Sequence, residues 1–92
     1  MGKAAEQPLL AWFKEARKAR WTGPADIKDA YRTASFVANN RVVFNVGGNK
    51  FRLIVAVIYA TPPKHPKPRE GVVYVRFVGT HKQYDAVDAS KV

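Results

Sequence analysis

The sequence predicts an α+β fold in which two N-terminal helices cover one face of an antiparallel sheet of three or four strands, followed by a short C-terminal helix. Apolar residues recur at helical spacing up to Ala34, whereas apolar and polar residues alternate from Ser35 onward. Short Asn-rich and Gly-rich segments separate the alternating runs, as is typical of antiparallel hairpins. A chain of 92 residues can bury one modest core, so we expect a single domain over residues 1–92.

Two helices are expected before the sheet. The apolar spacing predicts the first over residues 8–20, with Pro8 in its first turn. Pro24 suits the first position of a second helix, and Asp26 lies near the end of that helix where the dipole favours a negative charge. The expected apolar faces are Leu9, Trp12, Phe13, Ala16 and Ala19 in the first helix, and Ile27, Ala30, Tyr31 and Ala34 in the second.

Four strands and a final helix are expected after Ser35. The turn residues Ala38-Asn39-Asn40 and Gly47-Gly48 divide the first three strands, which we expect over residues 35–37, 41–46 and 49–59. The last strand is expected over residues 72–78. Thr80 and Gln83 have the spacing of a capping box, which predicts a helix over residues 81–87.

The segment from Thr61 to Gly71 interrupts the sheet. It holds four of the six prolines, and proline cannot donate to a strand ladder. We therefore expect an extended basic loop that joins the last two strands. A tolerated surface insertion and an added RNA or ribosome contact are both open interpretations of it.

Alternate residues divide the strands into two chemically different faces. The first face is expected to form the core under the helices, and the second is expected to be an open, positively charged surface. The core set is Val42, Phe44, Val46, Phe51, Leu53, Val55, Val57, Val73, Val75 and Phe77. The opposite set is Arg41, Val43, Asn45, Lys50, Arg52, Ile54, Tyr74, Arg76 and Val78.

The composition restricts the function classes. Sixteen Lys and Arg against seven Asp and Glu give a formal net charge of +9, which favours a polyanionic partner such as nucleic acid. The absence of cysteine excludes disulfides, thiolate metal sites and a cysteine nucleophile. His65 and His81 have no second ligand at zinc spacing, and the apolar runs are too short for a membrane span. We expect a soluble, cytoplasmic protein with no metal or other cofactor.

A catalytic site is one of two open interpretations of the region where the basic strand face meets the last helix. Arg52 and Arg76 interrupt apolar strands, and a phosphate is a natural partner for a guanidinium group there. His81 and Tyr84 lie about one helical turn apart just beyond Arg76. Histidine, arginine and tyrosine supply the base, cation and acid that metal-free RNA cleavage requires. The competing interpretation is an ordinary solvated sheet face with a histidine on the surface.

Two long blocks of the sequence resemble the HigB-type toxins of the RelE superfamily. The first block consists of two segments, Pro24 to Lys28 and Ala34 to Leu53, and the second segment includes Phe44-Asn45-Val46-Gly47-Gly48-Asn49. The second is Val75-Arg76-Phe77-Val78-Gly79-Thr80-His81-Lys82-Gln83-Tyr84-Asp85. The resemblance implies a metal-independent ribonuclease that cleaves translated mRNA at the ribosome, and a helix-turn-helix antitoxin of the HigA type that neutralises it.

The resemblance also implies roles for individual residues. The implied catalytic residues are Arg52, Arg76, His81 and Tyr84, with the general base unassigned, and Lys50 joins the arginines in binding phosphate. With Lys50, the expected RNA-binding residues are Arg41, Asn45, Tyr74 and Lys82.

This chain departs from the family pattern in two places. Relatives usually carry a further strand and helix before the segment that matches Leu9, so we expect an exposed sheet edge. The loop over residues 61–71 is also longer than the tight connection usual in the family. A degenerate toxin that binds RNA, ribosome or antitoxin without cutting is the alternative function. A DNA-binding regulator is disfavoured because the basic groups lie on strands.

Overall fold

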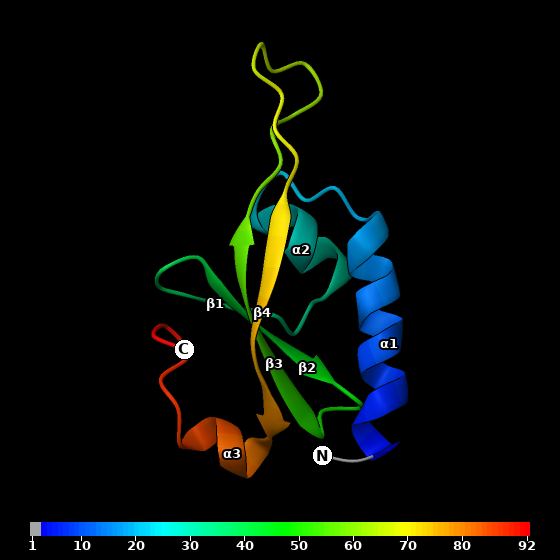
Figure 1. Cartoon of the computed structure of the whole chain (residues 1–92), viewed down its shortest axis with the longest axis vertical. Coiled ribbons are helices and arrows are strands. Elements are labelled where there is room, and N and C mark those ends of the chain that lie inside the picture. Colours follow the sequence, from blue (N-terminus) through cyan, green and yellow to red (C-terminus); the bar gives the residue numbers. More distant parts are fainter. Residues whose placement is uncertain (1–2) are drawn as a thin grey trace.

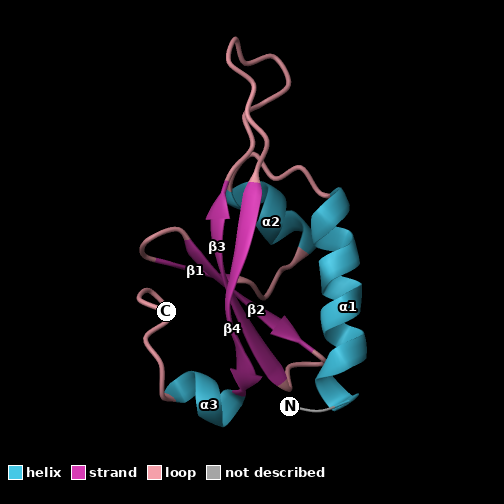
Figure 2. Cartoon of the chain, viewed as in Figure 1, coloured by secondary structure: helices cyan, strands magenta, loops and turns pink. Residues whose placement is uncertain are grey.

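A computed structural model describes residues 3–92 and confirms the predicted α+β class (Figure 1). Helices α1 and α2 lie on one side of a four-stranded antiparallel sheet of order β1-β2-β3-β4, and α3 follows the last strand (Figure 2). No helix among the described residues is long and apolar enough to cross a membrane. The elements are α1 (Lys3–Lys18), α2 (Pro24–Ala30), β1 (Ser35–Val37), β2 (Arg41–Val46), β3 (Phe51–Ile58), β4 (Val72–Thr80) and α3 (His81–Asp85).

Helix α1 begins five residues before its predicted start at Pro8, at Lys3. The extra turn is stabilised by Ala5, which is only 2% exposed and belongs to the core. Proline gives up one backbone hydrogen bond inside a helix, and burial of this first turn offsets that loss. The predicted apolar face is also partly wrong: Trp12 is buried, but Phe13 is 49% exposed and Ala19 lies beyond the helix.

Helix α2 begins at Pro24 as predicted, and Asp26 fixes the chain that leads into it. The Asp26 carboxylate accepts hydrogen bonds from the main-chain N–H and the hydroxyl of Thr22, both at 2.8 Å. These two bonds lower the pKa of Asp26 below its ordinary value of 3.8. The ionised carboxylate is therefore bound more favourably in the folded chain than in the unfolded chain.

Substitution of Asp26 by alanine is expected to remove part of the pH dependence of folding. A lowered folded-state pKa contributes stability above the unfolded value, and this contribution is lost as the pH falls through and below 3.8. The Asp26→Ala variant should melt at a lower temperature than the wild type at neutral pH, and the two should converge in strongly acidic solution. Melting followed by circular dichroism across this range checks the prediction. An equal difference at every pH would contradict it.

The strands and turns follow the sequence prediction closely. Asn39 and Asn40 have positive φ angles of 64° and 61°, and Gly47 and Gly48 have φ angles of 66° and 61°. Asparagine and glycine are the residues that tolerate this left-handed region. The β1–β2 and β2–β3 hairpins therefore form where expected, and β2 pairs with β3 from Arg41 to Val46.

A β-bulge in β4 exchanges the two faces of that strand. Ile54 pairs with Phe77 and Val55 pairs with Val75, so Arg76 is the extra residue. Phe77 consequently shares the face of Ile54, whereas Val78 packs against the core. The predicted assignments of Phe77 to the core and Val78 to the opposite face are wrong, because a bulge shifts the alternation by one residue.

The core lies between the helices and the sheet. All seven residues that the alternation assigned to it in β2 and β3 are buried, together with Trp12, Trp21 and Ile27. Val75 is a further predicted core residue that lies outside the core: it is 53% exposed because β4 is an edge strand. The seven are Val42, Phe44, Val46, Phe51, Leu53, Val55 and Val57.

The other face of the sheet is less open than predicted. Val43 and Ile54 on this face are 4% and 0% exposed. The segment after α3 returns along the sheet, where Asn39 donates to the main-chain oxygen of Ser90 at 2.9 Å and Arg41 donates to that of Val92 at 2.9 Å. The exposed basic surface is therefore restricted to the end of the sheet near α3 and to its borders.

The proline-rich segment, residues 61–71, projects from the end of the β3–β4 hairpin and is named the arm below (Figure 1). The described residues measure 44 × 26 × 19 Å along their principal axes. The arm lies at one end of the long axis, and α3 lies toward the other end (Figure 1). As predicted, the arm contains no helix or strand.

Candidate active site

Arg52 is the centre of a polar cluster at the α3 end of the sheet. It lies on β3, with Asn45 of β2 and Gly79 of β4 as its paired neighbours. Its side chain is half-buried. A Cβ atom at Gly79 would lie 2.6 Å from the Phe77 ring and 2.9 Å from Gln83 Oε1, so only glycine permits this close packing beside Arg52.

His81, the first residue of α3, bonds to Arg52 through one ring nitrogen and to the main chain through the other. Its Nδ1 atom lies 3.2 Å from Arg52 Nη2, and its Nε2 atom lies 3.0 Å from the carbonyl oxygen of Asn49. A guanidinium can only donate and a carbonyl can only accept. The two contacts together fit the tautomer that carries its proton on Nε2 and directs the lone pair of Nδ1 toward Arg52.

Tyr84 approaches the same guanidinium from α3. The centroid of its ring lies 5.9 Å from Arg52 Cζ, within the range of a cation–π contact. The predicted capping box holds α3 in this position: Thr80 Oγ1 accepts from the Gln83 N–H at 3.3 Å, and Gln83 Oε1 accepts from the Thr80 N–H at 2.8 Å. The cap thus fixes the direction in which α3 leaves the sheet and presents Tyr84 to Arg52.

Asn49 is a member of this cluster that sequence reasoning did not select as a site residue. It has a φ angle of 78°, and its side-chain Oδ1 accepts from Arg52 Nη1 at 3.1 Å. Its carbonyl oxygen accepts from His81. The sequence signal was available, because asparagine after two glycines is typical of a left-handed turn position. Asn49 therefore orients both the arginine and the histidine.

Arg76 does not join the cluster. Its Nε atom donates to the main-chain oxygen of Val92 at 3.2 Å, and Arg41 donates to the same oxygen at 2.9 Å. The bulge puts Arg76 beside Ile54 and Val55, whereas Arg52 is paired with Gly79. The guanidinium groups of Arg41 on β2 and Arg76 on β4 thus donate to the same oxygen atom, at a place on the sheet separate from the Arg52 cluster.

The remaining predicted RNA-binding residues are described by their position relative to the cluster around Arg52. Asn45 is directly opposite Arg52 in the β2–β3 pairing, and its Nδ2 atom lies 3.5 Å from the carbonyl of Thr33. Lys50 lies in the turn before β3 and Lys82 lies on α3, and both are exposed. Tyr74 is 51% exposed on β4, away from α3 and beyond the bulge. Asn45, Lys50 and Lys82 border the cluster, and Tyr74 lies apart from it.

The cluster contains the guanidinium of Arg52, which donates hydrogen bonds, the imidazole of His81 and the phenol of Tyr84. Within residues 3–92, no group of three or more His, Cys, Asp and Glu side chains is arranged to hold a metal ion. The chemistry available from the chain itself is proton transfer by His81 and Tyr84 beside the fixed positive charge of Arg52.

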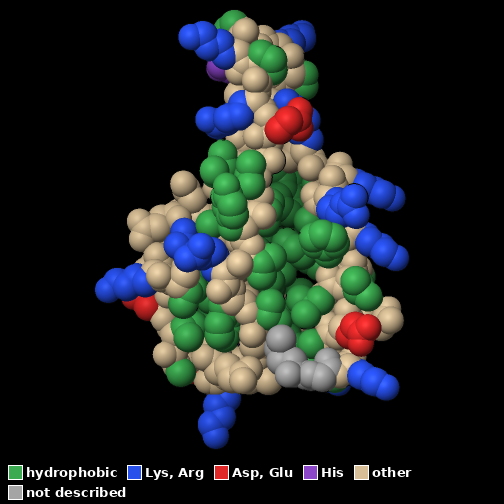
Figure 3. Space-filling model, in the orientation of Figure 1, with side chains coloured by type: hydrophobic (Ala, Val, Ile, Leu, Met, Phe, Trp, Pro, Cys, Tyr) green, Lys and Arg blue, Asp and Glu red, His purple; other side chains and the backbone are tan. Residues whose placement is uncertain are grey.

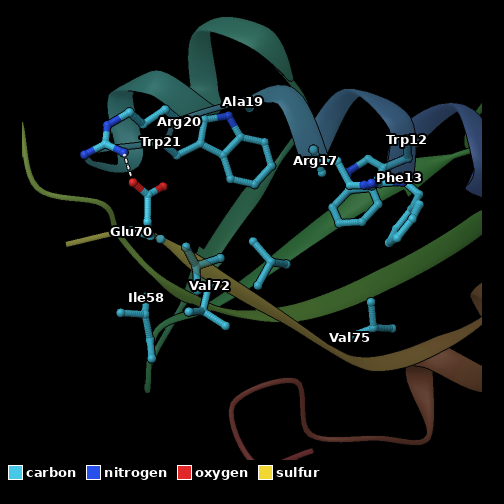
Figure 4. Close-up of a pocket in the computed structure, with 14 residues that line it drawn as sticks. Trp12, Phe13, Arg17, Ala19, Arg20, Trp21, Ile58, Glu70, Val72 and Val75 are labelled. Carbon is cyan, nitrogen blue, oxygen red and sulfur yellow. Dashed lines mark hydrogen bonds and ion pairs between the residues drawn. The ribbon is translucent and has the colours of Figure 1, made fainter.

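A separate hollow of about 270 Å³ lies between α1 and β4 (Figure 4). Its walls are largely apolar, and Figure 3 shows apolar side chains at the surface between the two elements. The Arg20–Glu70 ion pair, at 2.9 Å, lies at one end. Because these two charges neutralise each other and no histidine lines the hollow, it lacks an acid–base pair suited to RNA cleavage.

The comparison with known proteins decides the family. A sequence model of the HigB toxins, described as the RelE-like toxic component of a toxin-antitoxin system, matches residues 5–87. This chain belongs to the HigB toxin family. The match extends over α1 from Ala5 onward, α2, the whole sheet and α3, and so includes the cluster around Arg52. No curated protein matches this HigB toxin significantly. As a toxin of a toxin-antitoxin system, it has an antitoxin as its partner.

Proposed function

We propose that this HigB toxin is a metal-independent endoribonuclease that cleaves mRNA on translating ribosomes. Its activity is neutralised by a HigA-like helix-turn-helix antitoxin. The observation that supports the proposal most is the contact of His81 Nδ1 with Arg52 Nη2 at 3.2 Å, beside the ring of Tyr84. An imidazole, a guanidinium and a phenol at one exposed corner match the requirements of phosphodiester cleavage.

The proposed reaction is an attack by the RNA on its own backbone. The 2′-hydroxyl loses its proton to a base and bonds to the adjacent phosphorus, while the bond from phosphorus to the 5′-oxygen breaks and that oxygen takes a proton. The products are a 2′,3′-cyclic phosphate and a 5′-hydroxyl. Arg52 stabilises the charge that develops on the phosphate, and His81 and Tyr84 are the proton-transfer groups, with base stacking as a second role for Tyr84.

The flanking residues are proposed to bind the RNA on either side of the cleaved bond. Arg76 is proposed to bind a phosphate, with Arg41 beside it. Both guanidinium groups donate to the main-chain oxygen of Val92, so an RNA phosphate replaces that oxygen as their acceptor only when the segment after α3 moves. The other proposed contacts are Asn45, Lys50, Tyr74 and Lys82.

Primer extension on cellular mRNA after brief induction tests the proposal. Wild-type protein should arrest growth and produce discrete mRNA ends, and co-expression of the antitoxin should suppress both effects. Arg52→Ala should produce neither, because the phosphate then loses its fixed cation. Wild-type protein that binds ribosomes without producing new mRNA ends would contradict the ribonuclease and would favour the non-catalytic binding module.

A further inference from the structure

Hydrogen bonds hold the base of the arm, and the tip of the arm is exposed. Thr61 and Arg69 face each other at the base: the Thr61 N–H donates to the Arg69 carbonyl at 3.0 Å, and the Arg69 N–H donates to Thr61 Oγ1 at 2.6 Å. Arg69 also donates to the carbonyl of Tyr59 at 3.0 Å, and Arg20 bridges Thr61 and Glu70. These bonds hold the arm out from the sheet, so that its tip, residues 62–68, is exposed.

The tip carries positive charge without a compensating acid. Lys64 and Lys67 are exposed, and neither forms an ion pair among the described residues. Glu70 is the one acidic residue of the arm, and Arg20 neutralises it at 2.9 Å. Figure 3 shows basic side chains projecting around the arm. The two lysines therefore present unneutralised charge at the end of the molecule, which favours a polyanionic partner.

The arm is also restricted in conformation. Its four prolines fix their own φ angles and restrict the residues before them. His65 Nδ1 accepts from the Lys67 N–H at 3.0 Å and closes a local turn between the two lysines. A segment that is already restricted loses less conformational entropy on binding than a flexible basic loop.

The residue types of the arm favour the phosphate backbone of a folded RNA over single-stranded RNA. Lysine contacts phosphate as a point charge and carries little base information. The arm has no Phe, Tyr or Trp on which unstacked bases could pack, and such aromatic platforms are typical of single-strand binding. A helical RNA presents closely spaced phosphates without requiring stacking.

The position of the arm separates it from the active-site cluster. The arm and α3 lie toward opposite ends of the long axis, which measures 44 Å (Figure 1). We infer that Lys64 and Lys67 at the tip of the arm bind the phosphate backbone of a folded RNA. This contact is separate from the RNA strand that is proposed to bind at Arg52. The toxin would thus hold a structured RNA with one end while the other end meets its substrate. This goes beyond the proposed cleavage, since the arm binds whether or not the cluster cuts.

Salt-dependent binding to an RNA hairpin tests the inference. A hairpin with 2′-O-methyl sugars lacks the attacking hydroxyl, so binding is measured independently of cleavage. The magnitude of the slope of log affinity against log salt should fall by about 1 for each lysine removed, hence by about 2 in Lys64→Gln/Lys67→Gln. The matched control Lys3→Gln/Lys14→Gln, which removes the same charge from α1, should retain the wild-type slope. Cleavage of a short unstructured RNA should be unchanged in the arm variant.

Three outcomes would overturn the inference. They are an unchanged slope in the arm variant, an equal loss in the α1 control, and arm-dependent binding to anionic phospholipid vesicles with no arm-dependent binding to the hairpin. Failure of the wild type to cut any RNA would count against the proposed function alone, because the hairpin measurement does not depend on cutting.

Discussion

His81→Ala should lower the rate of RNA cleavage by about 10²- to 10⁴-fold, the contribution typical of a general acid or base. The substitution removes the imidazole that bonds Arg52 through Nδ1 and Asn49 through Nε2. Arg52 keeps its bond to Asn49 Oδ1, so the cation that binds phosphate stays near its original position. Single-turnover cleavage of a labelled RNA measures the loss, and growth on induction provides the same comparison in cells.

Arg32→Ala is the control for this experiment. Arg32 is exposed just beyond α2, and its loss lowers the net charge by one. It should cut RNA at nearly the wild-type rate, with a small loss from weaker long-range attraction. His81 is also exposed, so circular dichroism should show an unchanged fold in His81→Ala. A folded His81→Ala protein that cuts at the wild-type rate would remove His81 from the mechanism.

Phe44→Ala should destabilise the fold by about 3 to 5 kcal/mol, as expected for the loss of a buried aromatic ring. Phe44 is 1% exposed and is the ring on which three others converge. The ring centroids of Tyr31, Trp12 and Trp21 lie 5.0, 5.2 and 6.1 Å from it. These contacts join α1 and the residues on either side of α2 to the centre of the sheet. Removal of the Phe44 ring would therefore leave a cavity between the helices and the sheet.

Urea denaturation of Phe44→Ala and Phe13→Ala separates burial from simple loss of an aromatic ring. Phe13 is 49% exposed and contacts Arg17 through a cation–π interaction at 5.7 Å. Its removal should cost about 1 kcal/mol or less. Domains of this size are stable by roughly 5 to 15 kcal/mol, so Phe44→Ala should show a strongly lowered midpoint or be largely unfolded. Equal effects of the two substitutions would contradict the position of Phe44 at the centre of the core.

The fold was predictable where local chemistry and burial agree. The alternation in β2 and β3 identified all seven of their core residues, because both strands are central and are covered by helices on one face. The Asn39-Asn40 and Gly47-Gly48 turns were identified from residues that tolerate positive φ. The capping box identified the start of α3 to the residue, and with it the approach of His81 and Tyr84 to Arg52.

Features that depend on a single extra residue or on distant contacts were not predictable. The bulge at Arg76 leaves no local signal in the sequence, yet it exchanges the faces of Phe77 and Val78. The contact of Arg41 and Arg76 with Val92 depends on the path of the chain after α3, which periodicity does not encode. The early start of α1 depends on tertiary burial of Ala5. Each difference arises from packing between segments far apart in the chain.

The end groups of the RNA fragments test the active site most directly. Purified toxin should cut a defined mRNA on translating ribosomes and leave a 2′,3′-cyclic phosphate and a 5′-hydroxyl, with both products lost in Arg52→Ala and His81→Ala. These ends require the neighbouring 2′-hydroxyl as the nucleophile and no metal-activated water. Fragments that carry a 3′-hydroxyl and a 5′-phosphate would contradict a site built from Arg52, His81 and Tyr84.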